Sequence, residues 1–365
     1  MPQQIYLFIS LALSLYFGLH LLLFWLVVTF FNLKSNIARF RLGAFLFVLS
    51  LSFILAFFWV RFSGHHVLRW FYYGSALWLG ILINLLIILG VGLLLFTILK
   101  WLAIGINLKS LGFILLGLTA LTTIYGLYNA TQIKIKFLSV PVKNRPREWQ
   151  GKKIAHLSDL HLGILNRKDL TRKVADRINA QGVDLVFITG DLFDGSGDNL
   201  ADCVDPLNKI KAPIFYITGN HETYLGIAKT VAAIEKTKIR LLRDEMVDLG
   251  GVQLIGIDYP PRGTRKNLEP ILQKIDKSKP GILLYHEPSN RESARRFNIS
   301  LQLSGHTHNG QMWPMKIFTH LIYKGYDYGL HQTGDYFIYT TSGVGTWGPP
   351  MRIGSTPEIA IITIQ

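Results

Sequence analysis

The sequence predicts an α/β protein in two parts: an N-terminal four-helix transmembrane region and a C-terminal two-sheet α/β sandwich. Two observations support this prediction. Residues 1–133 contain seven Lys or Arg and no Asp or Glu, while residues 134–365 hold all 23 acidic residues. Beyond residue 153, short apolar segments alternate with segments of helical periodicity, which is typical of layered α/β domains. We therefore expect a membrane region at 1–133, a basic connector at 134–153 and a folded domain at 154–365.

The composition excludes several classes of protein. Hydrophobic residues make up 50% of the 365 residues and aromatic residues 12%, which excludes intrinsic disorder. Cys203 is the single cysteine, so a disulfide framework within the chain is excluded. The formal net charge of +15 is concentrated before residue 154, and no interleaved basic and aromatic module of a nucleic-acid-binding protein is present. We therefore expect no nucleic-acid partner.

Four apolar runs occupy the first third of the chain, at residues 5–31, 42–60, 73–99 and 111–128. Each run approaches or exceeds the roughly 20 residues that a helix needs to cross a bilayer core. None of the four contains Asp, Glu, Lys or Arg. The runs are apolar on all sides, whereas the helices of a soluble bundle carry a polar face. The chain is therefore expected to be a multi-pass protein of the cell membrane, with the lipid bilayer as a partner.

The basic residues between the runs predict which side of the membrane the C-terminal part occupies. Four spans place both termini on one side, together with Arg61, Arg69 and the segment 134–153, which carries seven Lys or Arg. The opposite side carries five cations, namely Lys34, Arg39, Arg41, Lys100 and Lys109. The positive-inside rule then favours a cytoplasmic C-terminal domain. Segment 134–153 either attracts anionic lipid headgroups or is a solvated linker, and the two interpretations are compatible.

Polar motifs follow five of the predicted strands. Strands at 153–158, 183–189, 213–218, 281–285 and 300–304 precede side chains suited to metal binding, namely Asp159, His161, Asp191, Asn220, His221, His286, His306 and His308. Because the carboxyl ends of strands border the ligand crevice in open α/β sheets, these side chains should gather at one edge. Asp159 and His161 are two residues apart, so on extended backbone they point to the same side, and His306 and His308 repeat this spacing. Carboxylate, imidazole and amide ligands suit Mn, Fe, Zn or Mg.

The motifs read D-x-H, G-D, G-N-H-E, H and G-H-x-H in chain order. This order resembles that of the calcineurin-like metallophosphoesterases, and the tail at 341–352 (TSGVGTWGPPMR) resembles their YkuE/YaeI-type branch. The resemblance covers about residues 153–365, and an N-terminal multi-pass membrane region fits the general habit of membrane-anchored members. Asn309 departs from the pattern, because many relatives of this branch have a second glycine there.

That resemblance implies a two-metal site and a role for each motif residue. One divalent ion would be held by Asp159, His161 and His308. The second would be held by Asn220, His286 and His306, with Asp191 bridging the two ions. His221 would lie near the leaving-group oxygen as an acid or transition-state stabiliser.

The same resemblance implies a metal-dependent phosphoric ester hydrolase, which cleaves a phosphodiester, phosphomonoester or pyrophosphate bond by metal-activated hydroxide. An enzyme that acts on a soluble substrate does not need four membrane spans, so a lipid or lipid-linked phosphoester is the favoured substrate. Two alternatives stay open: a tethered general phosphodiesterase on soluble substrates, and a membrane sensor or transporter regulated by its metal domain. Carriers usually place ionisable residues within their spans, and these runs contain only His20.

Further residues near the motifs have weaker signals. Asp194 and Glu222 adjoin expected ligands and are candidates for orienting the histidines. Arg352 is open to two interpretations, contact with a substrate phosphate or a surface position. His156 is expected to be structural, and Asn166 is expected to cap a helix at 166–180.

Overall fold

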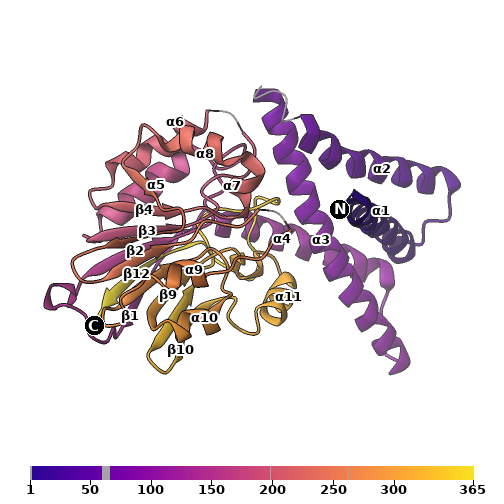
Figure 1. The fold of residues 1–365 in the computed structure, drawn as a ribbon. Helices are drawn as coiled ribbons and strands as arrows, with labels where there is room; N and C mark the ends of the chain where they lie inside the picture. Colours follow the sequence, from indigo (N-terminus) through magenta and orange to yellow (C-terminus); the bar gives the residue numbers. More distant parts are fainter. Residues whose placement is uncertain (1, 60–65, 198, 262) are drawn as a thin grey trace. The chain divides into compact units, whose positions relative to one another are not determined.

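The computed structural model describes residues 2–59, 66–197, 199–261 and 263–365 (Figure 1). It divides into two compact units, Met1–Tyr128 with Gly348–Met351, and Asn129–Trp347 with Arg352–Gln365. Val60, the end of the second predicted run, and Arg61, one of the charges that favoured a cytoplasmic domain, lie outside the described residues.

The N-terminal part contains four long helices, α1 (Pro2–Phe31), α2 (Asn36–Trp59), α3 (His66–Trp101) and α4 (Leu108–Ala130). Each of them includes a stretch long and apolar enough to cross a membrane, judged by length and composition. These helices coincide with the four apolar runs, so the prediction of four apolar N-terminal helices is confirmed.

His20 in helix α1 is buried and has a hydrogen-bond partner at each ring nitrogen. Trp78 in α3 can only donate, so His20 Nε2 accepts from Trp78 Nε1 at 3.1 Å. Nδ1 then carries the proton and donates to the carbonyl oxygen of Tyr16 at 2.9 Å. His20 is therefore a helix-packing residue of α1 and α3.

The C-terminal part is built on two six-stranded sheets. The first sheet has the order β1 (Lys134–Val140), β12 (Glu358–Ile364), β2 (Lys153–Leu157), β3 (Leu185–Thr189), β4 (Ile214–Ile217) and β5 (Ile239–Leu241). The second has the order β10 (Gly329–Thr333), β11 (Tyr336–Thr340), β9 (Ile299–Ser304), β8 (Gly281–Leu284), β7 (Gln253–Gly256) and β6 (Glu245–Asp248). Strands β2 to β5 are parallel, whereas β12 is antiparallel to β2. The predicted two-sheet α/β fold is confirmed.

Helices cover the outer faces of the two sheets (Figure 1). Helices α5 (Lys168–Asn179), α6 (Leu200–Val204) and α8 (Ile227–Ile234) lie on the first sheet, and α9 (Glu269–Leu272) and α10 (Arg291–Arg296) on the second. The remaining elements are α7 (Asn220–Leu225), α11 (Met315–Ile322) and three 3₁₀ helices, η1 (Arg147–Trp149), η2 (Asp205–Lys209) and η3 (His308–Gly310).

Alternating side chains fill the layers on each side of the first sheet. In β3, Leu185 and Phe187 pack between the sheets, while Val186 and Ile188 pack under the helices. This period of two is the geometry of a strand that is covered on both faces. Strand β3 is therefore buried on both faces, and its carboxyl-terminal end leads directly into the loop that carries Asp191.

Two details differ from the sequence prediction. The first seven residues of the predicted connector form strand β1, which pairs in parallel with β12 from Lys134↔Glu358 to Val140↔Ile364. Lysines are common on edge strands because they discourage pairing with other chains. Here the lysines gave strand β1 a composition that resembles that of a linker. The predicted cap at Asn166 is wrong: α5 begins at Lys168, and Asn166 Nδ2 donates to the carbonyl oxygen of Thr346 at 3.3 Å.

His156 in strand β2 predicts a loss of stability in acid. It is fully buried, with Nε2 2.8 Å from Thr189 Oγ1, and burial lowers its pKa to about 3. The folded state keeps His156 neutral, whereas the unfolded chain binds a proton near pH 6.5. The unfolding free energy should therefore fall by up to about 1.4 kcal/mol per pH unit between pH 6.5 and 3.

Calorimetry of the detergent-solubilised chain checks this expectation. His156→Gln keeps a partner for Thr189 but cannot take up a proton in this range. Between pH 6.5 and 5, the unfolding temperature of the native chain should fall more steeply than that of the variant. Equal slopes would show that His156 does not contribute to the acid sensitivity.

Candidate metal centre

Five strand ends bring the predicted ligand residues to one edge of the C-terminal part. Strands β2, β3, β4, β8 and β9 each end two or three residues before the first of these side chains, namely Asp159, Asp191, Asn220, His286 and His306. His161 and His308 follow two residues after Asp159 and His306. The parallel direction of these neighbouring strands within each sheet gives them a common carboxyl-terminal edge.

The first group of ligand atoms belongs to Asp159, His161 and His308, all three buried, with one ligand atom of each within 4.8 Å of the others. The Nε2 atoms of the two histidines lie 2.9 Å apart. Asp159 Oδ1 lies 3.5 Å from His308 Nε2. Two imidazole nitrogens and a carboxylate that converge in this way fit a divalent cation.

The second group contains Asp191, His286 and His306, whose ligand atoms also lie within 4.8 Å of one another. Asp191 Oδ2 lies 3.3 Å from His286 Nε2, which is 3.2 Å from His306 Nδ1. The amide oxygen of Asn220 completes the cluster, at 2.9 Å from His306 Nδ1 and 3.1 Å from His286 Nε2. This second set of nitrogen and oxygen donors also fits a divalent cation.

Asp191 lies between the two groups. Its Oδ2 atom is 3.3 Å from His286 Nε2 in one group and 3.8 Å from His161 Nε2 in the other. Its Oδ1 atom accepts a hydrogen bond from the backbone N–H of His221 at 2.9 Å, which fixes the orientation of the carboxylate. One oxygen of Asp191 therefore faces both groups.

Buried carboxylate and imidazole groups at the site shift the pKa values of one another. Burial opposes the charge of Asp191, but the imidazoles of His286 and His221 outweigh it and hold the pKa of Asp191 well below its usual range. Burial alone would lower the pKa of His286, yet Asp191 raises it to about 10. Burial and the neighbouring His161 hold the pKa of His308 well below its usual value, so its ring nitrogens carry the neutral form that metal ligation requires.

The backbone at the site is strained, and the extended geometry predicted for the two-residue spacings is wrong. Asp159, His161 and Asp191 have φ values of 55°, 49° and 51°, and His306 and His308 have 73° and 51°. A non-glycine residue in this left-handed region costs about 1–2 kcal/mol. Such strain clusters at functional sites, where the surrounding structure holds it in place.

The position of the missing glycine also adopts the left-handed conformation. Asn309 has φ 48° and ψ 40° within η3. Asparagine tolerates this region better than most residues, so Asn309 can adopt a turn conformation that favours glycine.

Neighbouring groups orient the candidate ligands. The Nδ1–H of His286 donates to the carbonyl oxygen of Thr189 at 2.6 Å, which turns Nε2 toward Asp191. Asp194 Oδ1 lies 3.2 Å from His161 Nδ1, as expected for an orienting group. Glu222 acts differently from the expectation: its carboxylate accepts the backbone N–H groups of Asp191, Phe193 and Gly219 at 3.0, 2.9 and 2.6 Å. It therefore holds two ligand-bearing loops together through the backbone.

Arg352 is completely buried, so the predicted surface position is wrong, while contact with a substrate phosphate stays a prediction. Its guanidinium donates to the carbonyl oxygens of Ser342 at 2.8 Å and Gly345 at 2.5 Å. One of its nitrogens, Nη2, lies 3.3 Å from His308 Nδ1. Arg352 thus folds the C-terminal tail against the loop that carries His308.

Sequence reasoning missed two exposed aromatic residues near His221. The ring of Tyr224 lies 5.2 Å and that of Trp347 6.2 Å from the ring of His221, measured between centroids. Tyr224 is four residues from Asn220 on one helix, so helical spacing could have indicated it. Trp347 is distant in sequence and carried no such signal.

Comparison with known proteins places this geometry in a family. The calcineurin-like phosphoesterase profile matches residues 152–310. An uncharacterised metallophosphoesterase of Helicobacter pylori is 37% identical over 220 residues, which cover 58% of this chain and 59% of the relative. A transmembrane protein with a metallophosphoesterase domain from Danio rerio is 31% identical over 271 residues, 68% of this chain and 61% of the relative.

The metallophosphoesterase YkuE of Bacillus subtilis is 28% identical over 246 residues and covers 60% of this chain and 81% of YkuE, which confirms the resemblance to that branch. The chain spans about 60% of the length of the Helicobacter and Danio relatives. The matched residues include all the clustered aspartates and histidines. A metallophosphoesterase of Aquifex aeolicus is 34% identical over 225 residues, which cover 85% of that relative, so the chain belongs to the calcineurin-like metallophosphoesterase family.

Proposed function

We propose that the chain is a membrane-anchored hydrolase of phosphoesters that uses two divalent cations, Mn, Fe, Zn or Mg. The observation that carries this proposal is the position of Asp191 Oδ2, which faces both candidate ligand groups at 3.3 and 3.8 Å. Bound in pairs, such cations activate water and offset the negative charge that develops on phosphate oxygens. Holding the cations and acting on the leaving group depend on the side chains of this chain.

In this proposal the two groups divide the ligands between them. One cation is held by Asp159, His161 and His308, whose ligand atoms lie within 4.8 Å of one another. Asn220, His286 and His306 hold the second, and Asp191 is shared. The hydrogen bonds that Asp191 and His286 make with their neighbours, and the approach of the Asp194 carboxylate to His161, preorganise the donors, so little rearrangement is needed on binding.

His221 is proposed as the residue that acts on the leaving group. Its Nε2 atom lies 3.9 Å from Asp191 Oδ2, beside the shared oxygen rather than within either group. The Nδ1–H donates to the carbonyl oxygen of Asp194 at 3.1 Å, which directs Nε2 toward the site. Burial lowers the pKa of His221, so its protonated form gives up a proton to a leaving oxygen more readily.

The membrane region leads to a proposal for the substrate. Four apolar helices anchor the chain, so we infer that the phosphoester belongs to a lipid or a lipid-linked molecule. The catalytic domain is proposed to be cytoplasmic, since the basic segment 134–153 follows the last span. The proposed division is a membrane region at 1–133, a basic segment at 134–153 whose first residues join the sheet, and the catalytic domain at 154–365.

A substrate panel tests the proposed function. Full-length chain in nanodiscs, loaded with Mn, would be assayed with bis-p-nitrophenyl phosphate, a phospholipid and a nucleotide-linked lipid. We expect hydrolysis of the chromogenic diester, and a kcat/KM at least about tenfold higher for one of the lipids because binding energy from the acyl chains adds to that of the phosphoester. Hydrolysis of the soluble diester alone would favour the tethered general phosphodiesterase. No hydrolysis by the metal-loaded chain would contradict the proposal.

A further inference from the structure

Helix α11 presents an unusually apolar surface outside the folded core. None of its eight residues is buried. Leu321 and Ile322 are 68% and 69% exposed, and Ile317 and Phe318 are about half exposed. Isolated exposed apolar residues are common, but contiguous apolar patches mark sites of interaction with a protein or a membrane.

The helix is amphipathic, but its polar face is turned toward its own domain and its apolar face is exposed, the reverse of a core helix. Ile317, Phe318, Leu321 and Ile322 share one side, because residues three and four apart lie on the same face. The polar side attaches the helix to its own domain: Thr319 Oγ1 donates to Asp327 Oδ2 at 3.2 Å, and His320 Nδ1 lies 3.1 Å from Asp327 Oδ1. The apolar side is therefore turned away from the domain to which the helix belongs.

Both ends of α11 are attached to the candidate metal centre. Gly310, two residues after His308, packs so closely on Lys316 that a Cβ atom would collide with its backbone. At the other end, the ring of Tyr323 lies edge-on to the ring of His306, with centroids 6.0 Å apart. An object bound to the apolar side of α11 therefore lies beside the loop that carries His306 and His308.

The charges and aromatic residues around α11 indicate what this object is. Residues 312–326 include Lys316, His320 and Lys324 and no acidic residue. Trp313 and Trp347, whose backbones hydrogen-bond to Ile353 and Gln311, are about half exposed. Lysines and tryptophans around an apolar helix face are the composition of helices that lie in the headgroup layer of a bilayer.

Covalent connection also favours the bilayer. Helix α4, the last candidate span, ends at Ala130, and strand β1 begins at Lys134. Three intervening residues reach about 10 Å when extended, so the domain is kept close to a bilayer whatever its orientation. The face that turns toward the lipid is then selected by surface chemistry.

We propose that α11 is a membrane-docking helix, whose apolar side inserts among lipid headgroups and brings the metal centre to the bilayer surface. The occupant is the lipid bilayer, favoured by anionic headgroups near Lys316 and Lys324. Membrane docking itself does not depend on the proposed function. Its consequence does, because we infer that the hydrolysed phosphoester is reached at the headgroup layer only if the chain is a phosphoester hydrolase.

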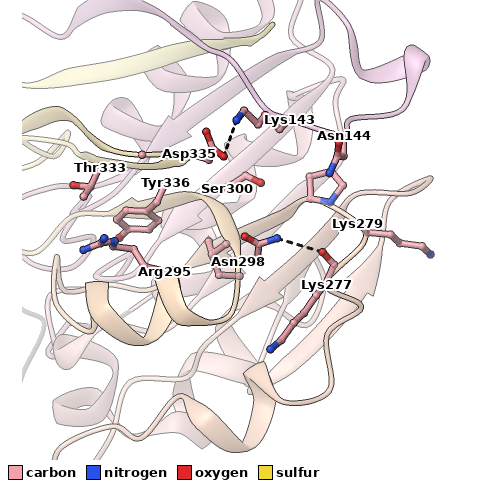
Figure 2. A pocket seen from close by; sticks show the side chains of 13 residues that line it. Lys143, Asn144, Lys277, Lys279, Arg295, Asn298, Ser300, Thr333, Asp335 and Tyr336 are labelled. Atoms are coloured by element: carbon pink, nitrogen blue, oxygen red, sulfur yellow. Dashed lines mark hydrogen bonds and ion pairs between the residues drawn. The ribbon is translucent and has the colours of Figure 1, made fainter.

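A second surface supplies the matched control. A polar pocket of about 300 Å³ lies at the opposite, amino-terminal ends of strands β8 and β9 (Figure 2). Its Lys143 pairs with Asp335 at 2.8 Å, and the side chains of Lys277 and Lys279 extend away from each other. The cations do not converge, and Lys277 is exposed at the end of the strands that is remote from the metal centre.

The test uses fluorescence of the full-length chain in nanodiscs, with Cys203→Ala so that one introduced cysteine is labelled. An NBD fluorophore would be placed at Leu321→Cys or, as the control, at Lys277→Cys, and doxyl-labelled phosphatidylcholine would be added to the lipid. We expect about twofold quenching and a blue-shifted emission at position 321, and neither at position 277. Adding Ile317→Glu and Ile322→Glu should remove the quenching at 321, and phosphatidylserine should strengthen it in the native sequence.

Equal quenching at the two positions, or none at 321, would overturn the proposal. Absence of quenching at 321 is also the result expected if another protein covers α11. The measurement requires neither bound metal nor turnover. A negative result therefore leaves the hydrolase proposal intact, while failure of the substrate panel leaves membrane docking intact.

Discussion

His221→Ala should abolish hydrolysis and keep most of the bound metal, whereas Asp191→Ala should lose both the hydrolysis and the bound metal. His221 lies beside the ligand groups, so its removal takes away proton donation and charge stabilisation, effects of about 10²–10⁴-fold on kcat. Asp191 presents one oxygen to both groups, and without it the second group has no carboxylate ligand and the first keeps only that of Asp159. Metal content by mass spectrometry and kcat for a chromogenic phosphodiester measure the two effects.

The matched control for both variants is Asp169→Ala, because Asp169 is an exposed carboxylate on α5 that pairs with Arg172 in the same helix. Its metal content and kcat should equal those of the native chain. Equal metal content together with equal activity in the His221 and Asp191 variants would contradict the roles proposed here.

Glu222→Ala should destabilise the catalytic domain and weaken metal binding, although Glu222 is not a proposed ligand. Its carboxylate accepts three backbone N–H groups, two of which belong to the proposed ligand Asp191 and to Gly219, which directly precedes the proposed ligand Asn220. Each buried donor left without an acceptor costs about 1–3 kcal/mol, so the loss of three acceptor contacts should lower the unfolding free energy by roughly 3–9 kcal/mol. Denaturant unfolding and metal content measure the result.

Glu222→Gln separates the loss of the acceptor from the loss of charge. Burial and the nearby Asp191 raise the pKa of Glu222 to about 7, so a neutral side chain of the same shape is a close substitute. We expect Gln to keep one acceptor oxygen and more than half of the stability that Ala loses. An unfolding free energy for Glu222→Ala within about 0.5 kcal/mol of the native value would show that the three hydrogen bonds do not stabilise the domain.

The sequence was most informative where ligand residues directly follow buried strands. Asp159, Asp191 and His286 each come within two residues of a strand end, so chain direction alone predicted their common edge. The local conformation could not be predicted in the same way. Extended backbone was expected at Asp159 and His161, but both are left-handed, and that strain is stabilised by contacts distant in sequence, such as the N–H of His306 on Asp159 Oδ2 at 3.0 Å.

Burial was the property that sequence patterns predicted least well. Arg352 is charged and lies in a Gly- and Pro-rich tail, yet it is completely buried because its guanidinium makes six hydrogen bonds and contacts to residues 342–355 and His308. The apolar residues of α11 have the spacing of a core helix and are exposed. In strand β1, alternating lysines concealed a strand whose partner, β12, lies more than 200 residues later.

Metal titration of the full-length chain tests the proposed two-metal hydrolase. After removal of bound metal with a chelator, no hydrolysis of bis-p-nitrophenyl phosphate should remain. Stepwise addition of Mn should restore activity as the second ion per chain binds, because one shared carboxylate joins the two ligand groups. Hydrolysis by the metal-free chain, or no hydrolysis with two Mn ions bound per chain, would contradict the proposal.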